Sequence, residues 1–294
     1  MKKIIMGLLL STLSLNAQTM NKHIYPCIWF DNNAKAAADF YINVFENSKI
    51  TSESPVVVNF ELNGVPFMGL NGGSLFKPNP SVSYFVYCDQ DHNKIETLYQ
   101  KFSEGGMVIF PLDKYDWSER YAWVQDKFGV SWQLDIEVIN NPQKIVPNLL
   151  FANQKTTKVK EATLFYTSVF SPSQILMEYE SPDSSNLLFA QFKINDYLFN
   201  AMSAQDEQQE HDFSEGNSFV IECDSQEEID HYWKHFTDGG KESMCGWVQD
   251  RYGVWWQVIP SILKELMSNP DKAQKVVEAF MKMKKFDIET LKNV

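Results

Sequence analysis

Short segments of the chain alternate apolar and polar residues, and longer segments carry apolar residues at helical spacing. Residues 56–62 place Asn59 and Glu61 on a polar face opposite an apolar face, which predicts a half-buried strand. The Asn-Gly pair that follows favours a tight hairpin turn. Residues 33–45 instead carry apolar side chains three and four positions apart, which predicts a helix.

This order of elements then recurs. A strand at 24–30 precedes the first helix, and a second strand and helix are predicted at 81–88 and 93–102, before further strands that run to Gln133. Helices segregated on one face of a mostly antiparallel sheet give an α+β layer structure, whose other sheet face is free to curve around a ligand. In the last strand, Ser131, Gln133 and Asp135 point away from the helices, toward either a ligand or solvent.

One motif occurs twice, 124 residues apart. Residues 123–133 and 247–257 are identical at eight of eleven positions, and both read Trp-Val-Gln-Asp, two variable residues, Gly-Val, a variable residue and Trp-Gln. A period above a hundred residues is too long for a solenoid repeat and matches a whole domain. The chain therefore reads as two copies of one fold.

The start of the chain predicts a secretory signal peptide over residues 1–17. Two lysines precede an apolar run, and Ala17 suits a small-residue cleavage site. The run is too short to span a bilayer, and an uncleaved anchor is the alternative. We therefore expect an exported protein, periplasmic or extracellular, with no membrane association once the signal is removed.

The composition is acidic. The chain has 38 Asp and Glu against 26 Lys and Arg, and removal of Lys2 and Lys3 with the signal leaves 24 basic residues. Nucleic acid is therefore not an expected partner. The four cysteines include no Cys-x-x-Cys pair, so export permits disulfides without predicting them.

Three motifs carry a resemblance to a known family. They are the segment from Ile24 to Asp31, the Leu70-Asn71-Gly72-Gly73 turn and the duplicated motif. On these the chain resembles the PhnB-like branch of the vicinal oxygen chelate superfamily, which includes glyoxalase I, bleomycin-resistance proteins and extradiol dioxygenases. The resemblance implies that each domain pairs two βαβββ modules into a curved sheet around a cavity, with helices on the convex face. It also implies that the two domains pack as an internal pseudo-dimer.

The resemblance covers residues 22–138 and 143–260, and residues 261–294 are predicted to form a C-terminal helical extension. This branch is often labelled 3-demethylubiquinone-9 3-methyltransferase-like. A Rossmann-type methyltransferase needs a glycine-rich turn between a parallel strand and a helix. The Gly-Gly pairs of this chain occur in other contexts, so methyltransferase activity is not expected.

Members of the wider superfamily typically hold a divalent metal with four His or Glu side chains on inward strand positions. Carried over onto this sequence, the last position falls on Gln133 and on Gln257. The other three fall near Pro26, Met68 and Ser81 to Ser83 in the first copy, and near Pro147, Asn200 and Asn217-Ser218 in the second. None of these is His, Asp or Glu, so neither a tightly held metal nor another cofactor is expected.

The leading hypothesis is therefore a protein that binds a small organic molecule without a tightly bound metal. Its expected polar contacts are Gln133, Gln257, Asn71 and Asn200, and its expected aromatic walls are Trp29, Trp123, Trp247 and Trp255. The competing hypothesis is a lyase, isomerase or dioxygenase that uses a loosely bound divalent ion and Glu61, although Glu61 also fits the outer face of a hairpin. A third is a scaffold whose cavities are filled by side chains.

Overall fold

The computed structural model describes residues 24–205 and 209–294. The predicted signal peptide lies outside the described residues. No helix in the described part of the chain combines the length and the apolar character that a membrane span requires.

The first repeat consists of two modules, each a strand, a helix and three further strands. The first module contains β1 (Ile24–Phe30), α1 (Ala34–Val44), β2 (Lys49–Glu53), β3 (Val57–Leu62) and β4 (Val65–Asn71). The second contains β5 (Val82–Tyr87), α2 (His92–Ser103), β6 (Met107–Tyr115), β7 (Ser118–Gln125) and β8 (Ser131–Asp135). The predicted hairpin turn joins β3 to β4, with positive φ angles of 48° at Asn63 and 78° at Gly64.

The second repeat has the same two-module order. Its first module contains β9 (Ile145–Phe151), the 3₁₀ helix η1 (Asn153–Lys158), α3 (Val159–Val169), β10 (Ser173–Glu180), β11 (Leu187–Ile194) and β12 (Tyr197–Ser203). Its second contains β13 (Asn217–Cys223), α4 (Gln226–Thr237), β14 (Lys241–Glu242), β15 (Trp247–Gln249) and β16 (Trp255–Pro260). Three helices follow: α5 (Leu263–Ser268), α6 (Pro270–Phe280) and α7 (Ile288–Lys292).

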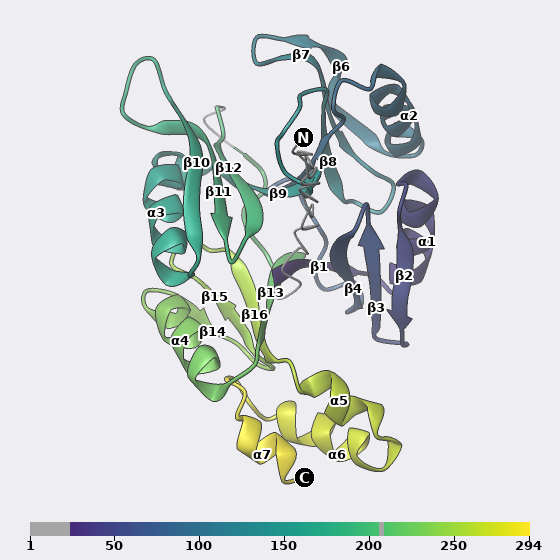
Figure 1. The fold of residues 1–294 in the computed structure, drawn as a ribbon, viewed down its shortest axis with the longest axis vertical. Helices are drawn as coiled ribbons and strands as arrows, with labels where there is room; N and C mark the ends of the chain where they lie inside the picture. Colours follow the sequence, from purple (N-terminus) through teal and green to yellow (C-terminus); the bar gives the residue numbers. More distant parts are fainter. Residues whose placement is uncertain (1–23, 206–208) are drawn as a thin grey trace, which may run out of the picture.

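The strands form two eight-stranded mixed sheets, and each sheet takes one module from each repeat. The first sheet has the order β14-β15-β16-β13-β1-β4-β3-β2, and the second has the order β10-β11-β12-β9-β5-β8-β7-β6. Helices α1 and α2 lie on one side of the molecule and α3 and α4 on the other (Figure 1). The α+β class with paired βαβββ modules is confirmed. The pairing of the modules differs from the expectation. Each module shares a sheet with a module of the other repeat, and not with the other module of its own repeat.

The first strand of each module determines how the modules pair, because it has a partner strand on both of its edges. The first strand of each module pairs antiparallel with the first strand of its partner module: β1 with β13, and β5 with β9. On its other edge each first strand pairs in parallel with the last strand of its own module, as β1 does with β4. A repeat therefore supplies half of each sheet.

The duplicated motif connects the two modules of each repeat, on the face of the sheets that the helices cover. The buried carboxylate of Asp126 accepts hydrogen bonds from the Tyr41 hydroxyl at 2.8 Å, the Trp132 indole at 2.9 Å and two backbone N–H groups. In the second repeat Asp250 accepts the same four bonds, with Tyr166 and Trp256 as its side-chain donors. Because the tyrosine belongs to the first module and the aspartate to the second, the motif fastens the two modules of one repeat.

The predicted alternation of β8 is confirmed. Trp132 and Leu134 are fully buried on the helix side, where Trp132 stacks on Phe102 at 4.8 Å, while Gln133 and Asp135 lie on the opposite face. We call the helix-free face of the first sheet cup A and that of the second sheet cup B.

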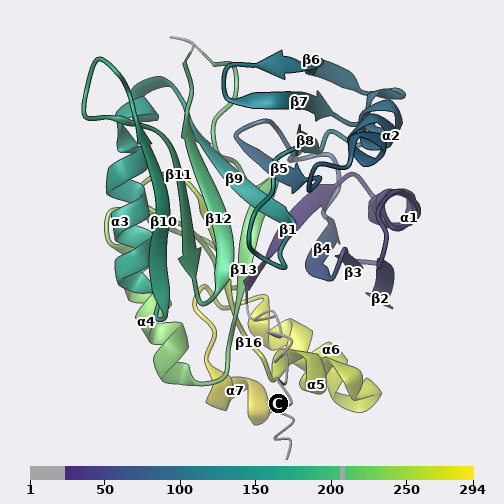
Figure 2. The ribbon, with the colours of Figure 1, turned by 45° about the horizontal axis from the view of Figure 1, so that its top comes forward.

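The two sheets differ most at one edge. Strands β6 and β7 form a long hairpin at the end of the molecule away from α5, α6 and α7 (Figure 2), whereas their counterparts β14 and β15 are two and three residues long. The C-terminal helices are attached beside the short hairpin, where the backbone N–H groups of Cys245 and Gly246 donate to Met283 and Lys284 at 2.7 Å.

Candidate functional site

The floor of cup A gathers four side chains from both repeats. Cys27 on β1 is the register partner of Met68 on β4 and of Ser218 on β13. Gln257 on β16 donates from Nε2 to the Ser218 hydroxyl at 3.0 Å, and the Cys27 thiol lies within hydrogen-bonding reach of both residues. Three of these side chains are less than a tenth exposed, so the floor is largely shielded from water.

Cup B has a matching group at the same register. Asn148 on β9 is the partner of Asn200 on β12 and of Ser83 on β5. Gln133 on β8 donates from Nε2 to the Ser83 hydroxyl at 2.7 Å, as Gln257 does to Ser218. All four side chains are completely buried.

These two groups of four lie at or next to the positions that the resemblance implies for metal ligands. Gln133, Gln257, Met68 and Asn200 are the residues that the sequence indicated. The first-strand position is Cys27 and Asn148, one residue after Pro26 and Pro147. Each group also combines two residues from each repeat, because the sheets combine modules across repeats.

The donor chemistry does not fit the divalent metal of the wider superfamily. Amide, hydroxyl and thioether groups are neutral and weak ligands. The remaining group in cup A is a thiol, which must lose its proton to bind a metal, and burial raises the pKa of Cys27 to about 12. Among residues 24–205 and 209–294 no cluster of three or more His, Cys, Asp or Glu is placed to hold a metal ion.

Tryptophans form one wall of cup A. The Trp29 ring meets Trp247 edge to face at 6.2 Å, and Trp247 meets Trp255 in the same way at 6.3 Å. Trp29 and Trp247 are only partly buried. These rings give cup A an apolar wall that remains accessible above its polar floor.

The glycine turn after β4 positions Trp29. Its indole N–H donates to the Gly73 carbonyl at 2.7 Å. A Cβ atom on Gly72 would lie 2.1 Å from the Trp29 ring, so only glycine leaves room for this placement. The Leu-Asn-Gly-Gly turn is therefore part of the construction of cup A.

The carboxylates on the cup A face already have partners. The Tyr25 hydroxyl donates to Glu222 at 2.7 Å, and Glu61 lies 3.4 Å from the ammonium group of Lys49. Glu61 shares the helix-free face because Phe60 and its neighbours at alternate positions face the helices. It is two residues along β3 from Asn59, the register partner of Met68, which places it one side-chain row away from the floor.

In cup B the polar groups bond to one another. Gln133 Oε1 accepts a hydrogen bond from the Tyr121 hydroxyl. Asn200 donates to the Tyr87 hydroxyl at 3.0 Å, and Gln191 donates to Asn200 Oδ1 at 3.0 Å. The Oδ1 atom of Asn148 is the exception among these buried floor groups, because it has no hydrogen-bond partner in the described structure.

Aromatic and aliphatic side chains surround this network. Phe85, Tyr87, Tyr121, Trp123, Val146, Leu150 and Leu198 form the buried cluster of cup B. Trp123 stacks on Phe110 at 6.0 Å and donates its indole N–H to the Ser131 hydroxyl at 2.6 Å. The predicted Trp123 and Gln133 thus lie on the helix-free face in a closed environment. In cup A Gln257 is also buried, whereas Trp247 is only partly buried.

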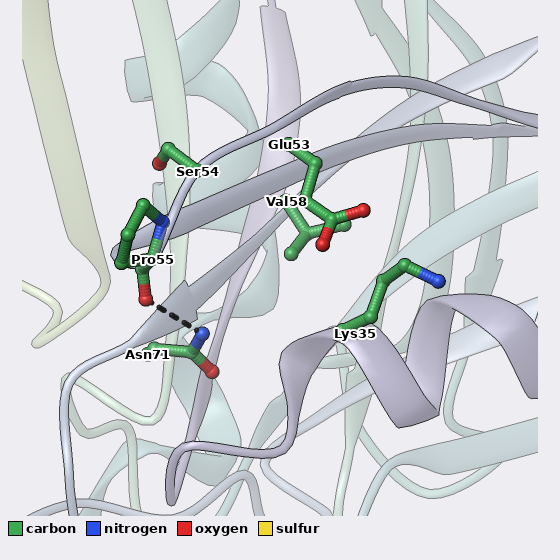
Figure 3. A pocket seen from close by; sticks show the side chains of 6 residues that line it. All are labelled: Lys35, Glu53, Ser54, Pro55, Val58 and Asn71. Carbon is green, nitrogen blue, oxygen red and sulfur yellow. Dashed lines mark hydrogen bonds between the residues drawn. The ribbon is translucent and has the colours of Figure 1, made fainter.

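Asn71 lies apart from both cups. Its Oδ1 accepts a hydrogen bond from the backbone N–H of Ala34 at 2.9 Å, at the start of α1, and its Nδ2 donates to the Pro55 carbonyl at 3.0 Å (Figure 3). It lines a hollow of about 400 Å³ that also includes Lys35 and Glu53. The structure thus places Asn71 on the helix side of β4, where it caps a helix.

One ionisable group in cup B was not among the predicted site residues. Asp135 is 7% exposed, and burial raises its pKa to about 6, although hydrogen bonds from Ser118 at 2.7 Å and from the Glu137 backbone act in the opposite direction. The strand pattern assigned Asp135 to the helix-free face, but burial of its carboxyl depends on β7 and could not be read from the sequence.

Comparison with solved structures supports the fold. Maize glyoxalase I superposes with a TM-score of 0.57 at 12% identity, covering 85% of this chain and 98% of that chain. A Bacillus subtilis protein whose description names a dioxygenase gives 0.51 at 10% identity, covering 92% and 93%. A PhnB protein from Bacillus cereus is 30% identical over 38% of this chain and 96% of its own, with a TM-score of 0.36.

No curated protein matches the chain. The family model described as 3-demethylubiquinone-9 3-methyltransferase matches residues 22–135 and again residues 143–259. The two matches together span well over half of the sequence. The chain therefore belongs to this PhnB-like family of the vicinal oxygen chelate superfamily, in a tandem two-domain form.

Proposed function

We propose that this protein binds a small, uncharged organic molecule with a planar or apolar part in cup A, and that it does so without a resident divalent metal. The observation that carries the proposal is the chemistry of the floor. Cys27, Met68, Ser218 and Gln257 lie at or next to the positions that the resemblance implies for metal ligands, and they supply neutral groups. Neutral donors and acceptors suit the carbonyl or hydroxyl groups of an organic ligand better than a cation.

Cup A is preferred to cup B because of its accessible wall. Trp29 and Trp247 are partly buried and can cover a ring, whereas the counterpart of Trp29 in cup B is the buried Leu150. Aromatic walls with a few convergent polar groups are typical of small-molecule sites. Gln257 Oε1 and the Ser218 hydroxyl are the groups that we expect to orient the ligand.

The metal-dependent alternative rests on Glu61. Its carboxylate lies on the cup A face, but it pairs with Lys49 and lies one side-chain row from the floor. Methyltransferase activity, named in the description of the family model, is not part of the proposal. A Rossmann-type cofactor site needs a glycine-rich turn between a strand and a helix, and the four segments that join a module's first strand to its helix contain no glycine.

The test is to purify the protein natively from its own host, denature it and identify released compounds by mass spectrometry, with metal analysis of the same sample. We expect an organic compound at near-stoichiometric level, lost in Trp247→Ala and retained in Phe189→Ala, a matched aromatic truncation on the cup B wall. A stoichiometric divalent ion that disappears in Glu61→Gln would contradict the proposal and favour the enzyme.

We also propose export, on the basis of residues 1–17. Sequencing the N-terminus of the native protein should give a chain that begins at Gln18, recovered from the periplasm or the medium. A mature chain that retains Met1 in the cytoplasm would refute export without affecting the cup A proposal.

A further inference from the structure

The hairpin formed by β6 and β7 exposes an aromatic side chain that contributes little to the core. Trp117, at the tip of this hairpin, is 59% exposed. The hairpin is longer than its counterpart in the second repeat by about ten residues, and the extra residues include Trp117. Binding residues are disproportionately located on loops held by a rigid scaffold, so an exposed aromatic ring on this inserted hairpin is a candidate ligand contact.

The Trp117 ring is held in place from behind. It stacks on Tyr115 at 4.9 Å with an interplanar angle of 21°, and it meets Tyr121 edge to face at 5.6 Å. Tyr121 is itself buried in cup B, where its hydroxyl donates to Gln133. The exposed ring is therefore a supported platform rather than a freely rotating side chain.

A hollow of about 620 Å³ adjoins this platform. It is lined by Lys114, Tyr115, Asp116, Trp117, Ser118, Glu119 and Glu137. Lys114 pairs with Glu119 at 2.8 Å, so these two charges compensate each other. Asp116 and Glu137 have no ion-pair partner within the part of the chain that the structure describes, which leaves the lining with two uncompensated negative charges.

A further acidic group lies directly behind the lining. The Ser118 hydroxyl donates to the buried carboxylate of Asp135 at 2.7 Å, so Ser118 separates the hollow from a carboxylate. The negative face of an indole ring and nearby carboxylates both attract a cation, and both act most strongly on one that sheds its water readily. Quaternary ammonium groups have this property.

We propose that the hairpin carries a site for a small organic cation with a quaternary ammonium group, seated on the Trp117 ring and attracted by Asp116 and Glu137. This site is separate from the floor of cup A and does not depend on the ligand proposed there. A neutral ligand of the same shape would contact the ring but would gain nothing from the uncompensated carboxylates.

The test is a calorimetric or NMR titration of the folded, signal-free protein at low salt with choline and with its neutral isostere 3,3-dimethylbutan-1-ol. We expect choline to bind in the millimolar range and the isostere to bind at least about fivefold more weakly. Trp117→Ala should weaken choline binding by about fivefold or more, and Glu137→Gln by about two- to threefold. Tyr179→Ala is the matched control, because Tyr179 is also 59% exposed, and it should leave binding unchanged.

Three outcomes would overturn the proposal. They are no detectable choline binding, equal binding of the isostere, and binding that survives Trp117→Ala. If binding survives Trp117→Ala but is lost in Trp247→Ala, the cation occupies cup A, so this proposal fails and cup A is not restricted to uncharged ligands. If choline has no effect and Trp117→Ala changes the oligomeric state, the hairpin is a contact between copies of the chain.

Discussion

Cup A leaves tryptophan rings accessible above a short polar floor, whereas cup B seals an equivalent floor under tyrosines and amides. Gln257 donates to the Ser218 hydroxyl and lies within hydrogen-bonding reach of the Cys27 thiol, while Gln133 bonds to the hydroxyls of both Ser83 and Tyr121. The register of the two floors is the same. The difference therefore lies in the side chains placed around a common strand arrangement.

Single exchanges between equivalent positions explain much of this divergence. The position of Trp29 is Leu150 in cup B, and Gly72, which makes room for Trp29, corresponds to Ala204. Trp255 corresponds to the smaller Ser131, which accepts the Trp123 indole N–H instead. The two cups thus share one scaffold, in which cup B forms a closed polar network and cup A has an accessible aromatic wall.

The largest expected effect tests whether the scaffold is the same in both repeats. Asp126→Ala should lower the free energy of unfolding by about 3–5 kcal/mol, because four buried donors lose their acceptor. Asp250→Ala should have the same effect within about 1 kcal/mol. Urea denaturation followed by far-UV circular dichroism measures both. A large difference between the two variants would mean that the repeats do not share one structural junction.

The next effect is a difference in stability loss when the equivalent glutamine of each floor is replaced. Gln133→Leu should cost about 2–3 kcal/mol, since it leaves the Tyr121 and Ser83 hydroxyls buried without their partner. Gln257→Leu should cost only about 1 kcal/mol, because it leaves one hydroxyl, that of Ser218, without its partner, and its other contact is with the weakly hydrogen-bonding thiol of Cys27. Thermal melts of the two variants provide the comparison. Equal losses would show that cup A is as closed and as interdependent as cup B.

The sequence could predict the faces of the strands but not the partners of the modules. The alternation in β3 and β8 correctly assigned Glu61, Gln133 and Asp135 to the helix-free face, since the period of a strand is a local property. Which edge pairs with β1 is decided by a strand nearly two hundred residues away. The similarity of two repeats contains no information on whether their modules pair within a repeat or across repeats.

The sequence also predicted only part of the candidate site. Gln133 and Gln257 follow from the duplicated motif, whereas the resemblance gave the first-strand position only as near Pro26. Because a shift of one residue moves a side chain to the opposite face of the sheet, the structure was needed to identify Cys27 as the residue on the floor. Asn71, part of the Leu-Asn-Gly-Gly turn, was expected to be a polar contact of the ligand, but its side chain caps α1 from the other face of the sheet.

A smaller effect concerns Asp135, the buried acid of cup B. Cup A has no equivalent acid, because Ile259 occupies the corresponding position. The pKa of Asp135 is raised to about 6 in the folded protein, above the value near 4 that is usual in an unfolded chain. The unfolded state therefore loses this proton first as pH rises. The stability that a protonated Asp135 supplies is complete below about pH 4 and is lost between about pH 4 and 6.

Asp135→Asn should remove this part of the pH dependence. It keeps an acceptor for Ser118 and should raise stability above pH 6.5 by about 1–2 kcal/mol relative to the parent, with no gain below pH 4. Denaturant midpoints measured from pH 3.5 to 8 for both proteins give the difference curve. A flat difference curve would indicate that the carboxyl is solvated, and that cup B is open at this end.

The smallest effect concerns Glu61, on which the metal-dependent alternative for cup A depends. Its pairing with Lys49 involves a lysine side chain that is 67% exposed, and exposed ion pairs contribute little to stability. Glu61→Gln should therefore change the unfolding free energy by less than about 0.5 kcal/mol and leave the metal content of the purified protein at the trace level of the parent. Lys49→Gln is the matched control, because it breaks the same pair and keeps the carboxylate. If Glu61→Gln removed an ion that Lys49→Gln retained, the carboxylate would be a ligand, and cup A would differ from cup B by a metal centre and not only by its aromatic wall.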